Sequence, residues 1–119
     1  MASGLSRGVP DLSAANLRIV DILTDEHGQI LFHYSGVNGC RLTLGVHPDD
    51  PPSLGHGEGI LSQVWHMGGR HYSLVAEGMD SNKFAAISVL LLRWSTTQGP
   101  DSDTVLAVRE ATSSARPCA

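Results

Sequence analysis

Apolar and polar residues alternate along most of the chain between residues 17 and 77, as they do in β-strands that bury one face. The alternation predicts five strands, at 17–23, 29–34, 40–46, 60–67 and 70–77. In the first of them apolar residues fill both faces, so we expect a mostly buried strand. In the third, Leu42, Leu44 and Val46 alternate with Arg41 and Thr43. This is the clearest strand pattern in the chain.

The last two strands are joined by Gly68-Gly69, which suits the positive φ angles of a two-residue hairpin turn. Such a turn sets the register, so that Trp65 faces Tyr72 and His66 faces His71. Aromatic residues often pair across strands on the buried side of a sheet. We therefore expect the Trp65–Tyr72 face to be the core side and the histidine face to be the exposed one.

Helical spacing replaces the alternation after residue 78. Residues 79–82 supply capping side chains, and apolar residues then recur at helical intervals, which predicts a helix over about 80–94. Residues 1–11 are expected to be a flexible lead, and 95–119 a polar tail with room for one short further element near 104–108.

These elements predict one α+β domain over residues 12–94, a five-stranded, mainly antiparallel meander sheet with one helix packed on one face. The predicted core includes Trp65, Tyr72, Leu74, Phe84, Ile87 and Leu91. The stretch 47–59, rich in proline and glycine, is expected to be a loop between the two halves of the sheet. A loop of this length suits recognition, although a plain connector is the commoner role.

The charge balance argues against nucleic acid as a partner. Eight Lys and Arg stand against twelve Asp and Glu, for a formal net charge of -4, and the basic residues are scattered rather than gathered in a stripe. The longest apolar run, residues 87–92, is too short to cross a bilayer. The first residues lack the apolar core of a signal peptide, so export would depend on a segment outside this chain.

The two cysteines, Cys40 and Cys118, lack the close spacing of zinc sites and dithiol redox motifs. A disulfide between them would require an oxidising compartment. The position of Cys118, next to last in a polar tail, favours two free thiols instead.

Six histidines raise the possibility of a metal site, and the hairpin register brings His66 and His71 close enough to share one ion. A transition-metal site needs at least a third ligand. His33 and Glu77 are expected to face away from the core as well, but the sequence places neither of them beside the pair. Two ordinary surface histidines are the alternative, and no cofactor is predicted.

Catalytic motifs do not emerge from the sequence. It contains no G-x-S-x-G elbow, no cysteine in a recognisable reactive context, and no glycine-rich phosphate loop followed by lysine and a helix. We therefore expect a protein that is not an enzyme.

Three segments, in a fixed order, carry a resemblance to a known family. They are VPDLSAANL at 9–17, the strand pair ILFHY at 30–34 with RLTL at 41–44, and VWHMGGRHYSLVAEG at 64–78, which leads into the helix. Together they resemble the extracytoplasmic C-terminal domain of membrane-bound anti-sigma factors that control extracytoplasmic-function sigma factors. The resemblance covers about residues 9–93, and its motifs are structural rather than catalytic.

The resemblance implies a regulatory or sensory domain in the periplasm. Such a domain controls stress-response transcription through protein–protein interaction or regulated proteolysis, and its partner there would be a regulatory protein or a protease. The membrane would be reached through a transmembrane helix that is not in this chain, which would make the chain a fragment of a membrane protein. The His-x-x-x-Cys-x-x-Cys motif that binds the sigma factor is also missing, so sigma binding would need a segment outside this chain.

A small sheet with one helix leaves a sheet face and an edge uncovered. Such surfaces accept an added strand or a second copy of the chain, so a homodimer is one expectation and docking on the strand 60–67 is another. A simply solvated face is equally compatible with the sequence. The alternative function is a sensor that binds a small ligand or a transition metal through the His66/His71 face and the 47–59 loop.

Overall fold

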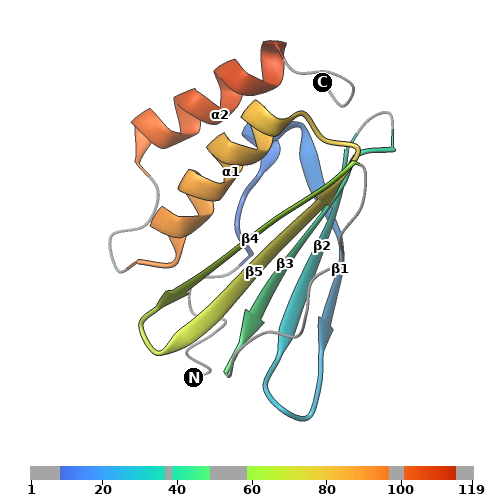
Figure 1. Cartoon of the computed structure of the whole chain (residues 1–119), viewed down its shortest axis with the longest axis vertical. Coiled ribbons are helices and arrows are strands. Elements are labelled where there is room, and N and C mark those ends of the chain that lie inside the picture. Colours follow the sequence, from blue (N-terminus) through green and yellow to red (C-terminus); the bar gives the residue numbers. More distant parts are fainter. Residues whose placement is uncertain (1–8, 37–38, 49–58, 97–100, 115–119) are drawn as a thin grey trace.

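The computed structural model describes residues 9–36, 39–48, 59–96 and 101–114. In chain order the elements are the 3-10 helix η1 (Ser13–Ala15), the strands β1 (Leu17–Thr24), β2 (Ile30–Gly36), β3 (Arg41–His47), β4 (Ile60–Met67) and β5 (Arg70–Glu77), and the helices α1 (Ser81–Trp94) and α2 (Ser102–Ser114). Both α-helices lie on the same side of a twisted sheet (Figure 1). The α+β class is therefore confirmed.

The strands form one antiparallel sheet in the order β1-β2-β3-β5-β4, so the predicted meander is wrong at one point. β3 pairs with β5, and β4 lies outside β5 at the edge. The Gly-Gly turn requires only that β4 and β5 be neighbours, and the long connection after β3 allows either strand to take the inner place. In the inner place of β5, Tyr72, Leu74 and Ala76 are all buried, whereas every residue of β4 is exposed or half-buried.

β1 is the opposite edge of the sheet, and the expectation that it is mostly buried is wrong. Seven of its eight residues are exposed, Leu17 being the exception. The register shifts between Ile19 and Asp21, which leaves Val20 as the extra residue of a β-bulge. The apolar residues on both faces of this strand thus indicate an uncovered edge rather than an interior strand.

Helix α1 begins as predicted, since Asp80 is its N-cap and accepts hydrogen bonds from the backbone N–H groups of Asn82 and Lys83 at 2.8 and 3.1 Å. The prediction of a single helix is wrong, because α2 follows and packs against α1 and η1. Its buried residues include Thr104, Val108 and Thr112, which lie four apart. Two of these three are polar, so the apolar periodicity that predicts a helix is weak here.

The core lies between the sheet and the two helices. Among the predicted core residues, Tyr72, Leu74, Phe84, Ile87 and Leu91 are buried, and Trp65 is half-buried at the β4 edge. Trp94 packs edge-on against both Phe32 and Tyr72, with ring centroids 6.3 and 6.4 Å apart. Such edge-to-face contacts stabilise aromatic clusters beyond the area that they bury.

The N-terminal segment is held against the sheet where the structure describes it. Pro10 and Leu12 are buried, and the Tyr34 hydroxyl donates a 2.7 Å hydrogen bond to the Pro10 carbonyl. Burial, with the negative charge of Asp11 nearby, raises the pKa of Tyr34 far above its ordinary value, so this hydroxyl stays protonated and keeps donating. Residues 1–8 of the predicted flexible lead lie outside the described residues.

Cys40 is buried and disulfide-bonded, so the expectation of a free thiol is wrong for this residue. The chain contains one other cysteine, Cys118. That residue lies outside the described part of the chain.

Candidate functional site

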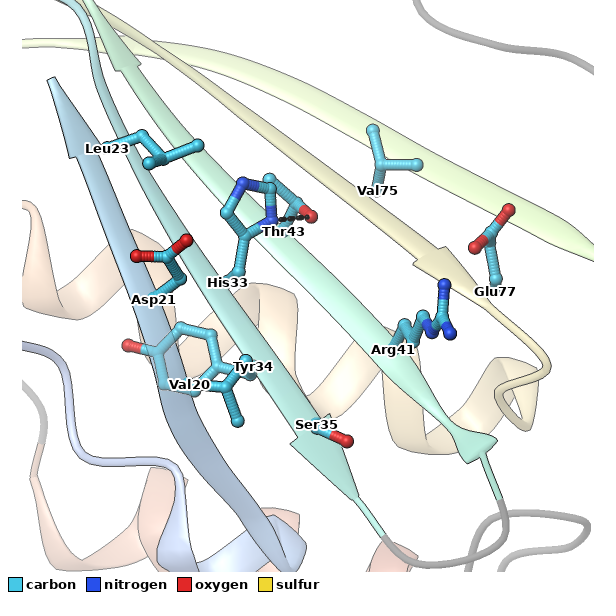
Figure 2. A pocket seen from close by; sticks show the side chains of 10 residues that line it. All are labelled: Val20, Asp21, Leu23, His33, Tyr34, Ser35, Arg41, Thr43, Val75 and Glu77. Carbon is cyan, nitrogen blue, oxygen red and sulfur yellow. Dashed lines mark hydrogen bonds between the residues drawn. The ribbon is translucent and has the colours of Figure 1, made fainter.

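The sheet face that points away from the helices, here called the open face, carries a groove of about 690 Å³ over β1, β2, β3 and β5. Figure 2 shows the residues that line it: Val20, Asp21, Leu23, His33, Tyr34, Ser35, Arg41, Thr43, Val75 and Glu77. Polar side chains from the middle strands and apolar side chains from β1 and β5 therefore share one depression.

His33 forms the centre of this groove. It faces Asp21 on one neighbouring strand and Thr43 on the other. Its Nδ1 lies 2.9 Å from the Thr43 hydroxyl oxygen, whereas the Asp21 carboxylate accepts its hydrogen bond from the backbone N–H of Ile22 at 2.9 Å. Asp21 and His33 are thus cross-strand neighbours, each with one polar atom bonded to another group.

Arg41 and Glu77 face each other at one end of the groove, on β3 and β5. No ion pair within 4.0 Å joins them in the part of the chain that the structure describes. The groove therefore holds one guanidinium and two carboxylates, Asp21 and Glu77, that are open to solvent. Opposite charges this exposed contribute little to stability, so they can exchange partners at small cost.

Three histidines form a row across the open face, outside the lining of the groove. His66 faces His71 as the Gly-Gly turn predicts, with ring centroids 4.6 Å apart, and His71 in turn faces His47 on β3. His47 was placed in the loop by the sequence pattern, yet it is the last residue of β3. The strand pattern extends to His47, because Arg41, Thr43, Gly45 and His47 occupy alternate positions on one face of the strand.

His47 is a structural residue rather than an open ligand. Its Nδ1 lies 2.8 Å from the Gln29 side-chain oxygen and its Nε2 lies 2.8 Å from the Ser73 hydroxyl. Burial lowers the pKa of His47, the neighbouring His71 lowers it further, and Asp25 acts against this shift. His47 therefore favours the neutral imidazole, with both ring nitrogens engaged.

The predicted metal pair, His66 and His71, is thus brought together without an available third ligand from His47. No group of three His, Cys, Asp or Glu side chains arranged to hold a metal ion occurs among the described residues. His33, Glu77 and the pair all lie on the open face, but the first two line the groove while the pair lies outside its lining. Most of the 47–59 loop lies outside the described residues.

A smaller apolar depression lies between the edge strand β4 and helix α1. This notch has a volume of about 140 Å³ and is lined by Gln63, Trp65, Ser88, Val89 and Leu92. Among its lining residues, Trp65 stacks on Tyr72 with ring centroids 5.2 Å apart and donates from Nε1 to the Ser95 hydroxyl at 3.1 Å. These contacts hold the indole in place, while Val89 and Leu92 remain exposed.

No protein-family model, curated protein or solved structure matches this chain. Among the described residues, no helix combines the length and the apolar character needed to span a membrane.

Proposed function

We propose that this chain is a non-enzymatic regulatory domain, the periplasmic part of an anti-sigma factor, and that it binds a protein partner along β4. The observation that carries the proposal is the edge position of β4 directly beside the apolar notch on α1. The family resemblance supplies the regulatory context.

An edge strand next to a helix offers two kinds of recognition at once. The outward backbone groups of β4 can bond to an extended peptide that adds a sixth strand, which gives affinity with little dependence on sequence. The notch against Trp65, Val89 and Leu92 can take one apolar side chain of that peptide, which gives specificity. The partner we propose is therefore an extended segment of protein with an apolar anchor residue.

The disulfide at Cys40 supports an extracytoplasmic location, because disulfides persist in oxidising compartments such as the periplasm. A β-lactamase fused to the end of the full natural reading frame tests this location. We expect the fusion to confer ampicillin resistance on the cell. Sensitive cells that contain the intact fusion protein would contradict a periplasmic domain.

The regulatory role is tested in the native organism with variants of the notch. Leu92→Lys and Val89→Lys place a charge in the apolar notch, so we expect each to shift the transcripts of one sigma-factor regulon toward the level in a strain that lacks this domain. Leu106→Lys is the matched control, because Leu106 is an exposed apolar residue on α2 outside the notch. If removal of the domain leaves every sigma-dependent transcript unchanged, the proposal is wrong.

A second candidate function, a sensor for a transition metal, rests on the close pairing of the His66 and His71 rings. Two imidazoles on neighbouring strands can bind one ion and leave its other positions to water or to a ligand from a partner. Titration with Zn²⁺ should then shift the ring signals of both residues in a saturable way, and His66→Gln should abolish the shift. Ring signals that do not respond would remove this candidate.

A further inference from the structure

The outer edge of β1 exposes more apolar surface than edge strands usually do. Four of its apolar side chains are exposed, Ile19 by 38%, Val20 by 55%, Ile22 by 41% and Leu23 by 46%. Natural edge strands commonly carry proline or charged residues, contain a bulge, or are covered by another segment, which limits further pairing. β1 contains no proline or lysine, its charged residues are Arg18 and Asp21, and its contacts within the described structure are mainly with β2 and η1.

The bulge at Val20 gives β1 a symmetric arrangement of side chains. Four residues lie on the helix-covered side of the sheet, because each faces a β2 residue of that side. They are Leu17, Ile19, Ile22 and Thr24. On the open face lie Arg18, Val20, Asp21 and Leu23, three of which line the groove (Figure 2). From Leu17 to Thr24 the side chains lie on the covered, open, covered, open, open, covered, open and covered side of the sheet. This order of sides is the same from either end of the strand.

This symmetry has a direct consequence for pairing. Residues that face each other across two antiparallel strands must lie on the same side of the sheet. When a regularly alternating strand pairs antiparallel with its own copy, facing residues lie on the same side only if the two-fold axis passes through one residue. That residue then faces its counterpart in the other copy. In β1 the bulge lets the two-fold axis pass between Val20 and Asp21 instead, with all eight residues matched.

We propose that β1 pairs antiparallel with β1 of a second copy of this chain, which joins two five-stranded sheets into one. The facing pairs are Leu17 with Thr24, Arg18 with Leu23, Ile19 with Ile22, and Val20 with Asp21, each formed twice.

The pairing forms apolar contacts on the covered side and opposite-charge pairs on the open face. On the covered side, two Ile19–Ile22 contacts remove exposed β-branched side chains from water. On the open face, Arg18 lies diagonally opposite Asp21 of the second copy, within the reach of a long side chain. The two-fold axis makes this charge pair twice. Because Val20, Asp21 and Leu23 line the groove, the groove continues across the axis onto the second copy.

The proposed dimer leaves the docking edge free, because β1 and β4 are opposite edges of the sheet. The inference therefore stands independently of the proposed function, and the two fail in different experiments. Variants of β1 test the dimer, and variants of the β4–α1 notch test the partner site.

Sedimentation equilibrium of the full chain between about 10 µM and about 1 mM tests the association. We expect a monomer–dimer equilibrium whose dissociation constant rises at least about tenfold in Ile19→Lys and in Ile22→Lys, since each puts a charge at an apolar contact. Val64→Lys, an exposed position on the opposite edge, is the matched control and should leave the constant unchanged. A chain that stays monomeric throughout, or a dimer weakened only by Val64→Lys, would overturn the proposal.

The register is tested separately. Arg18→Asp and Asp21→Arg should each weaken the dimer, and the double variant should restore it, because the charge pair is re-formed with its signs exchanged. In a mixture of isotope-labelled and unlabelled wild-type chain, a filtered NOE experiment should connect the Ile19 methyl groups of one copy with the Ile22 methyl groups of the other. A dimer that shows neither the rescue nor this NOE pairs by another surface. Circular dichroism of every variant establishes that the fold is intact.

Discussion

At the scale of single residues, the contact among Gly45, His47 and Ser73 shows how the sheet tolerates a buried histidine. His47 folds back over Gly45 to reach the Ser73 hydroxyl. A Cβ atom at position 45 would lie 2.5 Å from the His47 Nε2 and 2.6 Å from the Ser73 Oγ, closer than atoms can approach. Glycine is therefore required at position 45 because the open face has no room there for a side chain, and not because of its backbone angles.

Gly45→Ala should accordingly displace the His47 ring and break its bond to Ser73. We expect the free energy of unfolding, measured by urea denaturation, to fall by about 1–3 kcal/mol, as it does when side chains are forced into a packed site. In a His47→Ala background the same substitution should cost less, because the main obstacle is gone. An equal cost in both backgrounds would show that His47 is not the group displaced.

His47 also makes a prediction about pH. Its pKa is lowered in the folded protein, so the unfolded chain binds more protons as the pH falls below 6.5, the ordinary pKa of histidine. The stabilisation is thus complete above that value and is lost as the pH falls through the lower pKa of the folded state. Thermal unfolding between pH 7.5 and pH 5, a range set by the histidine titration, should show a falling midpoint.

The matched comparison for this pH effect is His47→Gln against His27→Gln. Glutamine at position 47 does not titrate, so the fall in the midpoint should become smaller. His27 is an exposed turn residue, and its replacement should leave the pH dependence of the wild type in place. Parallel pH profiles for wild type and His47→Gln would contradict the role of His47.

At the scale of elements, each α-helix begins at an aspartate. Asp80 caps α1, and before α2 the Asp101 carboxylate accepts from the Thr104 backbone N–H at 2.9 Å while the Thr104 hydroxyl oxygen accepts from the Asp101 backbone N–H at 3.2 Å. The bond from the Thr104 backbone N–H has the largest effect in lowering the pKa of Asp101, and the Thr104 side chain lowers it further. Such reciprocal caps start a helix even where its apolar periodicity is weak.

Asp80→Ala should remove the acceptor for two backbone N–H groups of α1. We expect a loss of about 1 kcal/mol in the free energy of unfolding, measured by urea denaturation. Ser81→Ala is the control, because Ser81 is exposed and the cap bonds come from Asp80. A larger loss from Ser81→Ala than from Asp80→Ala would mean that the cap is assigned to the wrong residue.

At the scale of the whole molecule, the disulfide at Cys40 adds a covalent link to a small domain. Cross-links stabilise chiefly by restricting the unfolded chain, typically by about 2–4 kcal/mol. Reduction with dithiothreitol should lower the thermal midpoint of the wild type and leave that of Cys40→Ala unchanged. A wild type whose midpoint is insensitive to the reductant would show that the bond contributes nothing to stability.

Local patterns predicted much of this fold. The Gly68-Gly69 turn predicted the register of β4 and β5, and the residues around Asp80 predicted the start of α1, since both depend on groups a few residues apart. The second helix was expected only as one short element near 104–108, because two threonines stand on its buried face. The open-face groove was missed because its lining comes from four strands, and alternation says which face a residue occupies but not which strand lies beside it.

The sequence by itself determined the class of the fold, the strand positions, the β4–β5 hairpin and the first helix, because alternation, turn residues and caps act over short distances. Only the tertiary structure decided the order β1-β2-β3-β5-β4, the exposure of β1, and the row that brings His47 beside His71. The physical reason is that these features depend on which strand gains most by burial in the middle of the sheet. That choice is settled by packing between segments far apart in the chain, and it is what leaves β1 and β4 as the two edges of the sheet.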